Sequence, residues 1–421
     1  MRMMLLQSIA AVLLLAVSVT RADEAMHPIA VTWESAAIGR PIKGELINPV
    51  NLTGTTRPLV IYQKNLSVPR LGTESDETIL KDFVQDAVFV LVLDYEKDKA
   101  AVSPTLNADA LKLRQDLAAK QPALLAELKG KINTNRVFIV AEGNRLAQNV
   151  EFAKDGKRTL GLDIVYPSKP AKPVPMLVEF SCDNAERMGI GSLLFCRDTL
   201  VDGAQYAGFA AAMADHPVAP PYKGFDDPMP AVFNRARDAV YAAWTFAGEH
   251  GLGVHRPIGI IGFSRGGPIA AMTAMNSLFR SHAANEDVSE KAMMQPMVGA
   301  ALVHGNRYDY LDLLPNDPMI DRFKKKWGDP ATQPSSWAVH SAVNYIGDPK
   351  RIAPMFLNTS RKESPEYQDG LAKFDKKLTE LGVEHVYQVD ADDRGHRVST
   401  DPKTLAAIYD FFAKHLKGDP K

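Results

Sequence analysis

The stretch from Ile258 to Gly267 constrains the fold more than any other part of the sequence. It reads IGIIGFSRGG, and an Ala- and Met-rich helical pattern follows it. Small residues at Gly262 and Gly266 let the chain turn sharply from strand to helix, because a side chain at either position would collide with neighbouring backbone. The pattern predicts a nucleophile elbow that raises Ser264 Oγ above a sheet edge, at a helix N-terminus. A glycine-rich turn with a capping serine is the simpler alternative.

The chain around this motif alternates strand and helix patterns. Strands are expected at 150–153, 160–166, 176–180, 209–215, 258–263, 298–304, 355–358 and 385–389, and helices at 229–251, 268–279, 366–381 and 402–416. The polar run 144–149 reads as a connection, and residues 154–157 as a hairpin turn. Such alternation predicts a mostly parallel sheet with helices on both faces.

Residues 306–347 interrupt this alternation with an irregular segment rich in aromatic residues, Asp and Pro. The segment follows a strand, so it is expected above the carboxyl edge of the sheet. It is a candidate cap that shapes a substrate pocket. Packed surface loops with ordinary aromatic anchors are the alternative.

The N-terminal part of the chain carries a second, shorter α/β pattern. Apolar runs at 59–62, 88–94 and 137–140 predict strands, and 106–129 predicts a helix between the last two. This part has no elbow, no Gly-x-Gly-x-x-Gly and no P-loop. We therefore expect an accessory α/β region at 23–147, followed by a catalytic domain at 148–421.

The first 22 residues have the pattern of a secretory signal. Arg2 precedes an apolar run from Leu5 to Val19, and Thr20 and Ala22 supply small residues before a cleavage point. About 15 apolar residues are too few to span ~30 Å of hydrocarbon as a helix, so cleavage is favoured over an anchor. No later run is long and apolar enough to span a membrane. The sequence thus predicts a secreted or periplasmic protein.

Export to an oxidising compartment would allow the two cysteines, Cys182 and Cys196, to form a disulfide. Glycines between them would let the chain turn, so a disulfide is one prediction. Two buried free thiols are the other.

Charge and composition exclude several classes of protein. The 421 residues carry 49 Lys and Arg against 50 Asp and Glu, a net charge of −1. Such a chain has nothing to neutralise many phosphates, so no nucleic-acid partner is expected. Two cysteines exclude a Cys-rich zinc or iron–sulfur domain. No His, Cys or Asp cluster has ligand spacing, and neither a metal nor a cofactor is expected.

A nucleophilic serine needs a base, and His396 is the best placed histidine. It lies in the loop between the last strand and the closing helix, where its side chain can reach back over the sheet. The other candidates end or open strands, or lie in the irregular segment or the last helix: His304, His340, His385 and His415.

The base in turn needs an orienting acid. Glu363 lies in the loop after strand 355–358, where such a carboxylate is expected. Its alternative role is that of an acid at a helix start. Asp309, in the loop after strand 298–304, is the rival acid. Asp392 and Asp393 are expected to be solvated loop charges.

With these residues in this order, the chain resembles the α/β-hydrolase superfamily over about residues 148–418. A second stretch, Asp215 to Pro221, looks like the segment after the fourth strand in secreted esterases of the dienelactone-hydrolase and feruloyl/acetyl-esterase type. Asp238 falls where those enzymes often carry an aspartate, which we interpret as structural. The resemblance implies an α/β fold with an eight-stranded sheet, a serine nucleophile and ester hydrolysis through an acyl-enzyme without a cofactor.

The chain departs from that pattern in two places. Esterases of this type usually have His-Gly after the third strand to help form the oxyanion hole, whereas this chain has Ser-Cys-Asp after Phe180. One oxyanion donor is then the backbone N–H of Arg265, and the second would come from Cys182 or Asp183. The second departure is Glu363 in place of the more usual Asp.

These features predict a secreted serine hydrolase that cleaves small-molecule or carbohydrate carboxylic esters. Ser264 would attack the carbonyl, His396 would move the proton, and Glu363 would orient His396. The side chain of Arg265 would meet an anionic substrate group or make a structural salt bridge. Two rivals remain, namely a serine peptidase of the prolyl-oligopeptidase-like type and an inactive hydrolase-like binding protein.

Overall fold

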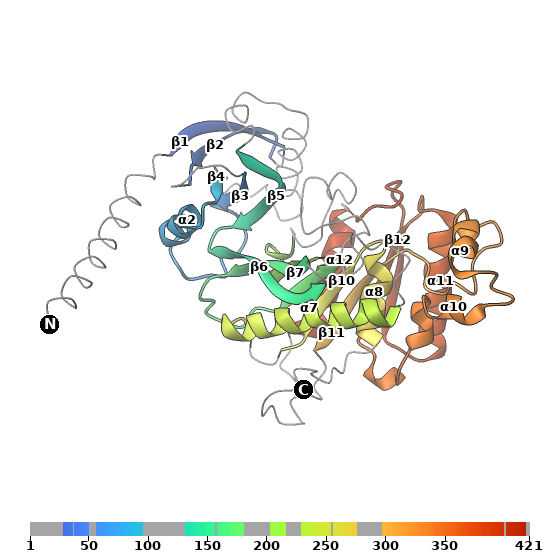
Figure 1. Ribbon diagram of the computed structural model, residues 1–421. Helices are drawn as coiled ribbons and strands as arrows, with labels where there is room; N and C mark the ends of the chain where they lie inside the picture. The colour runs from blue at the N-terminus through green and yellow to red at the C-terminus, as the bar shows by residue number, and fades with distance from the viewer. Residues whose placement is uncertain are drawn as a thin grey trace, which may run out of the picture. The chain divides into compact units, whose positions relative to one another are not determined.

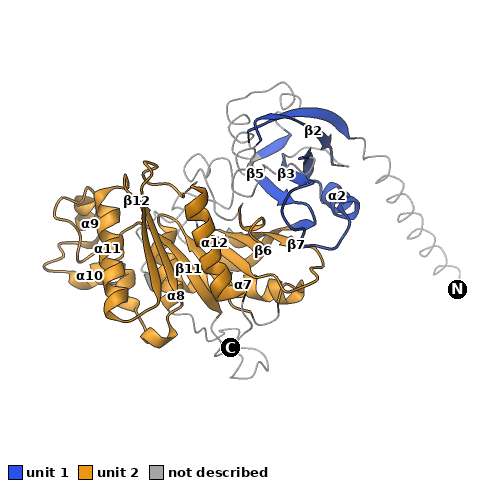
Figure 2. Cartoon of the chain, turned by 180° about the vertical axis from the view of Figure 1, so that it is seen from behind, with its two compact units in different colours: residues 1–145 blue, residues 146–421 orange. Residues whose placement is uncertain are grey.

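The computed structural model divides the chain into two compact units, Met1–Arg145 and Leu146–Lys421 (Figure 2). The predicted boundary between the two regions lies two residues later, at 147. The structure describes residues 28–36, 38–49, 56–95, 131–155, 158–180, 203–215, 229–253, 256–275, 297–399 and 401–417. The expected signal segment 1–22 and the expected helix 106–129 lie outside these ranges.

Unit 2 is built on an eight-stranded sheet in the order β13-β12-β11-β10-β8-β9-β7-β6 (Figure 1). The strands are β6 (Asn144–Asp155), β7 (Arg158–Pro167), β8 (Met176–Phe180), β9 (Ala210–Ala214), β10 (Ile258–Gly262), β11 (Val298–His304), β12 (Met355–Ser360) and β13 (His385–Asp390). Every pairing from β13 through β9 is parallel, and β9 pairs antiparallel with β7. The carboxyl ends of the parallel strands therefore meet at one edge.

Helices cover both faces of this sheet. They are α7 (Met229–Glu249), α8 (Gly266–Met275), α11 (Pro365–Glu380) and α12 (Pro402–Leu416). Two glycines of β10 show how closely they pack. A Cβ at Gly259 would meet Phe412 of α12 at 2.8 Å, and a Cβ at Gly262 would meet Ala270 of α8 at 2.5 Å. Because positions three apart on a strand point to opposite faces, α12 and α8 lie on opposite sides of the sheet.

Most predicted elements of unit 2 lie where the sequence pattern puts them, and two differ. The polar run 144–149 is the first half of β6, not a connection. β6 is the last strand of the sheet and its side chains are mostly half-exposed, so polar residues can occupy it. The predicted hairpin turn lies partly outside the described residues.

The segment 306–347 is also more ordered than expected. It contains the helices α9 (Ile320–Trp327) and α10 (Pro334–Ala338) and a 3₁₀ turn at Ala342–Tyr345. Four of its aromatic residues form one buried cluster, which comprises Tyr310, Phe323, Trp327 and Trp337. The short helices thus form around a core of their own, a tertiary effect that periodicity alone does not reveal.

Unit 1 contains a five-stranded sheet in the order β1-β2-β4-β3-β5. Its elements are β1 (Ile29–Ser35), β2 (Arg40–Ile47), β3 (Arg57–Lys64), α2 (Asp76–Gln85), β4 (Phe89–Asp94) and β5 (Ile132–Ala141). β3 pairs in parallel with β4 and β5, whereas β2 pairs antiparallel with β4. The three predicted strands are β3, β4 and β5, while β1, β2 and α2 were not predicted. Ser75 caps α2 by accepting the N–H of Thr78.

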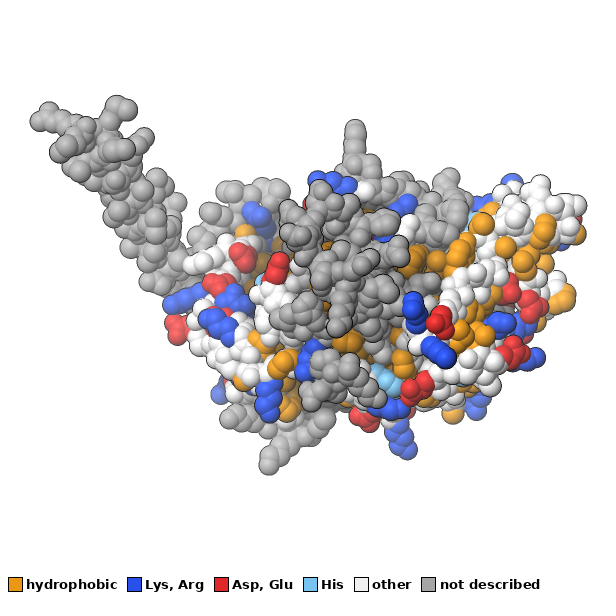
Figure 3. All heavy atoms as spheres, turned by 90° about the horizontal axis from the view of Figure 1, so that it is seen from below, with side chains coloured by type: hydrophobic (Ala, Val, Ile, Leu, Met, Phe, Trp, Pro, Cys, Tyr) orange, Lys and Arg blue, Asp and Glu red, His pale blue; other side chains and the backbone are white. Residues whose placement is uncertain are grey.

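On the face seen in Figure 3, acidic and basic side chains of the described residues are interspersed and do not gather by sign. None of the helices in the described part of the chain has the length and apolar character needed to cross a membrane.

The aromatic cluster yields a prediction for stability. Trp337 is 1% exposed and donates its indole N–H to the carbonyl of Gly328 at 3.1 Å. Trp337→Ala should lower the free energy of unfolding by about 3–5 kcal/mol, because it empties a large buried volume. Urea denaturation followed by circular dichroism measures this loss. Leu311→Ala, at a residue 45% exposed, is the control and should cost at most about 0.5 kcal/mol. A loss below about 1 kcal/mol for Trp337→Ala would mean that the cluster is not a cohesive core.

Candidate active site

The turn between β10 and α8 holds Ser264 in a strained conformation. Ser264 has a φ of +53°, a left-handed value that a residue with a side chain rarely adopts. A Cβ at Gly262 would lie 2.2 Å from the carbonyl oxygen of Gly266, so only glycine fits there. Hydrogen bonds from Gly266 N–H to Phe263 O at 2.8 Å and from Gly267 N–H to Ser264 O at 2.9 Å close the turn. The sequence IGFSRGG thus folds into the tight elbow that its glycines predict.

Residues beyond the motif also hold the elbow. Asn306, just after β11, donates its side-chain N–H to the carbonyl of Ser264 at 2.5 Å. A Cβ at Gly267 would lie 2.6 Å from the Tyr308 hydroxyl, so this glycine permits close packing of α8 against the loop after β11. Sequence reasoning did not single out Asn306. Its position directly after a parallel strand was the available signal.

The imidazole of His396 bridges Ser264 and Glu363. His396 Nε2 lies 2.9 Å from Ser264 Oγ, and His396 Nδ1 lies 2.7 Å from Glu363 Oε2. An ionised carboxylate can only accept, so Nδ1 carries the proton and Nε2 is left to accept the serine hydroxyl. Serine, histidine and acid are therefore connected in the order that an acyl-transfer triad requires.

Glu363 is oriented by its own surroundings. Its side chain is fully buried, and Oε1 accepts the N–H of Ser364 at 2.8 Å in the turn between β12 and α11. The rival acid, Asp309, instead accepts the N–H of Leu311 at 2.9 Å and closes a local turn. The Nδ1–H of His396 donates to Glu363 Oε2, so the structure places Glu363, and not Asp309, beside this imidazole.

The loop that carries His396 is fixed by a charged network at the ends of β12 and β13. Arg394 donates to Asn358 at 2.8 Å and pairs with Asp390 and Asp392. Burial alone would raise the pKa of Asp390, but hydrogen bonds from Gln388, Arg394 and Asn358 outweigh it and lower the pKa. Asp392 is thus part of an ion-pair network, a correction to its expected role as a solvated charge.

Asp393 is exposed and pairs with Arg361 at 3.0 Å. The pair links the loop after β12 to the loop after β13. Ion pairs between exposed side chains contribute little to stability, so Asp393 is close to the solvated charge that the sequence suggested.

Aromatic rings surround the imidazole. The centroid of the Tyr367 ring lies 4.6 Å and that of the Phe263 ring 5.0 Å from the centroid of the His396 ring. The Arg307 guanidinium lies 4.8 Å from the centroid of the Tyr367 ring. The same guanidinium pairs with the buried Asp317 at 2.6 Å. Burial raises the pKa of Tyr367, although Arg307 opposes the shift. The sequence pattern did not identify Tyr367 as a neighbour of His396.

Arg265, directly after Ser264, is buried. Its Nη1 donates to the hydroxyl of Tyr310 at 3.4 Å, so the guanidinium points toward the aromatic cluster of segment 306–347. Contact with an anionic substrate group and a structural salt bridge both remain predictions for this side chain. The second oxyanion donor, expected at Cys182 or Asp183, lies outside the described residues. Cys196 and the stretch 216–221 also lie outside them.

Asp238 lies on α7, as expected. Its structural role remains a prediction.

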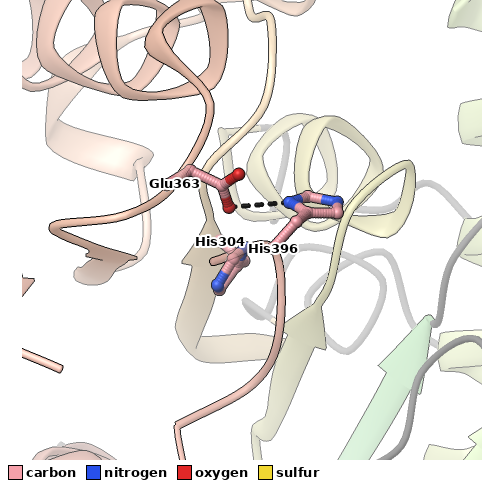
Figure 4. Close-up of side chains that lie close together, drawn as sticks. All are labelled: His304, Glu363 and His396. Carbon is pink, nitrogen blue, oxygen red and sulfur yellow. Dashed lines mark hydrogen bonds and ion pairs between the residues drawn. The ribbon is translucent and has the colours of Figure 1, made fainter. Parts of the chain in front are cut away.

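A second histidine, His304, lies beside Glu363 and His396 (Figure 4). One nitrogen or oxygen atom from each of His304, Glu363 and His396 lies within 4.8 Å of the others, a spacing that could also hold a divalent metal ion. The facing atoms of Glu363 and His396 already share a proton at 2.7 Å. A metal would have to displace that proton, so these side chains fit a triad with an adjoining buried histidine better than a metal centre.

Comparison with known proteins identifies the fold. No family model and no curated protein matches the sequence. A truncated carbohydrate esterase from gut microbiota is 16% identical with a TM-score of 0.50, over 66% of this chain and 99% of that one. An esterase from Thermogutta terrifontis is 16% identical with a TM-score of 0.45, over 66% of this chain and 97% of that one.

An acylaminoacyl peptidase bound to Z-Gly-Gly-Phe-chloromethyl ketone is 14% identical with a TM-score of 0.48. The match covers 67% of this chain and 43% of the peptidase, so it spans less than half of that protein. At such identities a structural match establishes the fold alone. The chain has the α/β-hydrolase fold, as its sequence predicts.

The environment of His304 predicts a pH dependence of stability. Burial, followed by the positive charges of His396 and Arg394, holds the pKa of His304 well below its ordinary value. The unfolded chain takes up a proton there as the pH falls through ~6.5, whereas the folded chain does not. The contribution of His304 to the free energy of unfolding is therefore fully present above that pH. Below it, this contribution is lost by about 1.4 kcal/mol per pH unit.

Urea denaturation between pH 7.5 and 5 measures this loss. The variant His304→Gln cannot titrate at this position, so its stability should fall less steeply with acid than that of the wild type. Parallel curves for the two proteins would contradict a buried neutral imidazole.

Proposed function

We propose that this protein is a serine hydrolase that cleaves carboxylic esters through an acyl-enzyme. The observation that carries the proposal is the continuous path from Ser264 Oγ through His396 to a fully buried Glu363, with hydrogen-bond distances of 2.9 and 2.7 Å. The strained elbow supports it, because a left-handed serine at this turn projects its hydroxyl above the sheet edge.

In the first half-reaction, Ser264 Oγ attacks the ester carbonyl carbon while its proton passes to His396 Nε2. The carbonyl electrons move onto oxygen, and Glu363 stabilises the imidazolium that forms. The tetrahedral intermediate then collapses and breaks the bond to the alcohol oxygen. This oxygen takes the proton from His396 and leaves as an alcohol, while the acyl group stays on Ser264.

In the second half-reaction, water attacks the acyl carbon and gives its proton to His396. Collapse returns that proton to Ser264 Oγ and releases the carboxylic acid, so no cofactor is consumed. The backbone N–H of Arg265, at the N-terminus of α8, is the proposed first donor to the oxyanion. A second donor from Cys182 or Asp183 remains part of the proposal.

We further propose that the protein is exported and acts on small-molecule or carbohydrate esters. The basic residue and apolar run at 2–19 support export. The carbohydrate esterase whose fold this chain shares makes carbohydrate esters the first substrates to try. The segment 306–347 is the proposed cap, because Tyr310 from its aromatic cluster contacts Arg265 beside the nucleophile.

The nucleophile can be tested directly. The wild type should hydrolyse p-nitrophenyl acetate and take up one fluorophosphonate, seen as a mass shift on Ser264. Ser264→Ala should lose both, with kcat/KM falling by about four orders of magnitude or more. Ser67→Ala, at an exposed serine of unit 1, is the control and should keep both. A wild type that neither reacts nor hydrolyses would favour the inactive binding protein.

The acid can be tested by a paired comparison. Glu363→Gln should reduce kcat/KM by at least about 100-fold, because an amide neither stabilises the imidazolium nor fixes its tautomer. Asp309→Asn should change it less than about threefold, since the amide oxygen can still accept the N–H of Leu311. The reverse pattern would transfer the role of the acid to Asp309.

The choice of substrate separates the esterase from the peptidase. With equal enzyme, p-nitrophenyl and acetylated-sugar esters should turn over, and aminoacyl-p-nitroanilides should not. Faster cleavage of the anilides would replace the proposed esterase with the peptidase and leave the roles of Ser264 and His396 intact.

A further inference from the structure

His304 is a buried polar group next to the proposed base that the mechanism above does not use. It is the last residue of β11 and is 4% exposed. Its ring lies edge-on to that of His396, with centroids 5.6 Å apart, and 4.6 Å from the ring of Phe263. Burying a polar side chain costs free energy unless the side chain makes a hydrogen bond.

That contact is made with the loop of the base. His304 Nε2 lies 3.1 Å from the carbonyl oxygen of Arg397, the residue after His396. A carbonyl only accepts, so Nε2 carries the proton. Nδ1 of the neutral ring is then unprotonated, and it is buried.

The backbone on both sides of His396 is thereby tied to the sheet. On the preceding side, the Ser360 hydroxyl at the end of β12 donates to the carbonyl of Gly395 at 3.1 Å. On the following side, His304 at the end of β11 donates to the carbonyl of Arg397. Arg394 also donates to that carbonyl, at 2.8 Å, but from within the same loop. The bond from His304 is therefore the one that ties this carbonyl to β11.

The charge state of His304 matters because of its neighbours. The charged groups that face it are His396 once protonated, Glu363 and Arg394. A positive charge on His304 would oppose the imidazolium that forms when His396 takes the serine proton. It would also compete for the Glu363 carboxylate. A neutral ring that donates through Nε2 holds the loop without either cost.

We propose that His304 is a positioning residue, which sets the distance and angle of the His396 imidazole to Ser264 and Glu363 by holding the Arg397 carbonyl as a neutral donor. The proposal rests on the function proposed above. It predicts that loss of the donor affects the chemical step, because a base displaced by about 1 Å can cost on the order of 100-fold in rate.

Two variants separate donation from packing. His304→Leu fills the space without a donor, whereas His304→Gln offers an amide N–H that can reach the same carbonyl. Hydrolysis of p-nitrophenyl acetate should show kcat reduced about 10- to 100-fold in His304→Leu, with KM within about twofold of the wild type. His304→Gln should recover most of this loss. If the side chain served packing alone, the apolar variant would be the better one.

The pH profile tests the neutral state. The acid limb of kcat/KM should lie at the same pH in the wild type and in His304→Gln, because a neutral ring has no charge to lose. An acid limb shifted to higher pH in the variant would show that His304 is charged and would overturn the proposal. Activity in His304→Leu equal to that of the wild type, or a change confined to KM, would also overturn it.

His250→Leu is the matched control. His250 Nδ1 lies 2.9 Å from the carbonyl oxygen of Phe246 on α7, the same kind of bond at an exposed place in unit 2. This variant should keep the wild-type kcat. Fluorophosphonate labelling and thermal unfolding of each variant report on whether it is folded. A wild type without esterase activity would overturn the proposed function and this inference together, whereas an active wild type with unaffected His304 variants would overturn this inference alone.

Discussion

The close approach of Gly262 to Gly266 is the constraint on which the rest of the site depends. The 2.2 Å that would separate a Cβ at Gly262 from the Gly266 carbonyl leaves no room for any side chain, and the turn it permits forces Ser264 to a φ of +53°. Left-handed backbone at a residue with a side chain costs of order 1–3 kcal/mol and persists only where the surroundings determine it. Here the surroundings are a central parallel strand and a fully buried helix, α8.

The partners of Ser264 come from other strands, so they depend on the register of the sheet. β10, β11, β12 and β13 lie side by side in parallel, and their carboxyl ends carry Ser264, His304, Glu363 and the His396 loop in that order. Arg394 connects the ends of β12 and β13 through Asn358 and Asp390. A slip of one residue in any of these strands would move its end and turn its side chains to the other face. The pairing of four strands is thus what converts separate loop residues into one hydrogen-bonded path.

The sequence predicts local features of the site better than features that depend on contacts between distant strands. The elbow is local, so Ser264 and its glycines could be read from ten consecutive residues, and the ends of apolar strands pointed to Glu363 and His396. Asn306, Tyr367 and the donor role of His304 depend on contacts across the sheet and were not predicted. The helices α9 and α10 were missed for the same reason, since both pack on a cluster that unites residues from Tyr310 to Trp337. Asn144 and its neighbours were misassigned because an edge strand need not show an apolar pattern.

The orientation of the Glu363 carboxylate follows from its surroundings. The side chain leaves the turn after β12 and passes Gly305, where a Cβ would lie 3.6 Å from Glu363 Cγ and 2.9 Å from the Thr359 hydroxyl oxygen. A Cβ at 305 would be too close to the Thr359 hydroxyl, whereas its distance to Glu363 is that of an ordinary contact. One carboxylate oxygen accepts the N–H of Ser364 and the other accepts the Nδ1–H of His396. An aspartate at the same position is one methylene shorter, so on the same backbone its carboxylate would lie farther from the imidazole. These two hydrogen bonds therefore fix a buried carboxylate in one orientation beside the His396 imidazole.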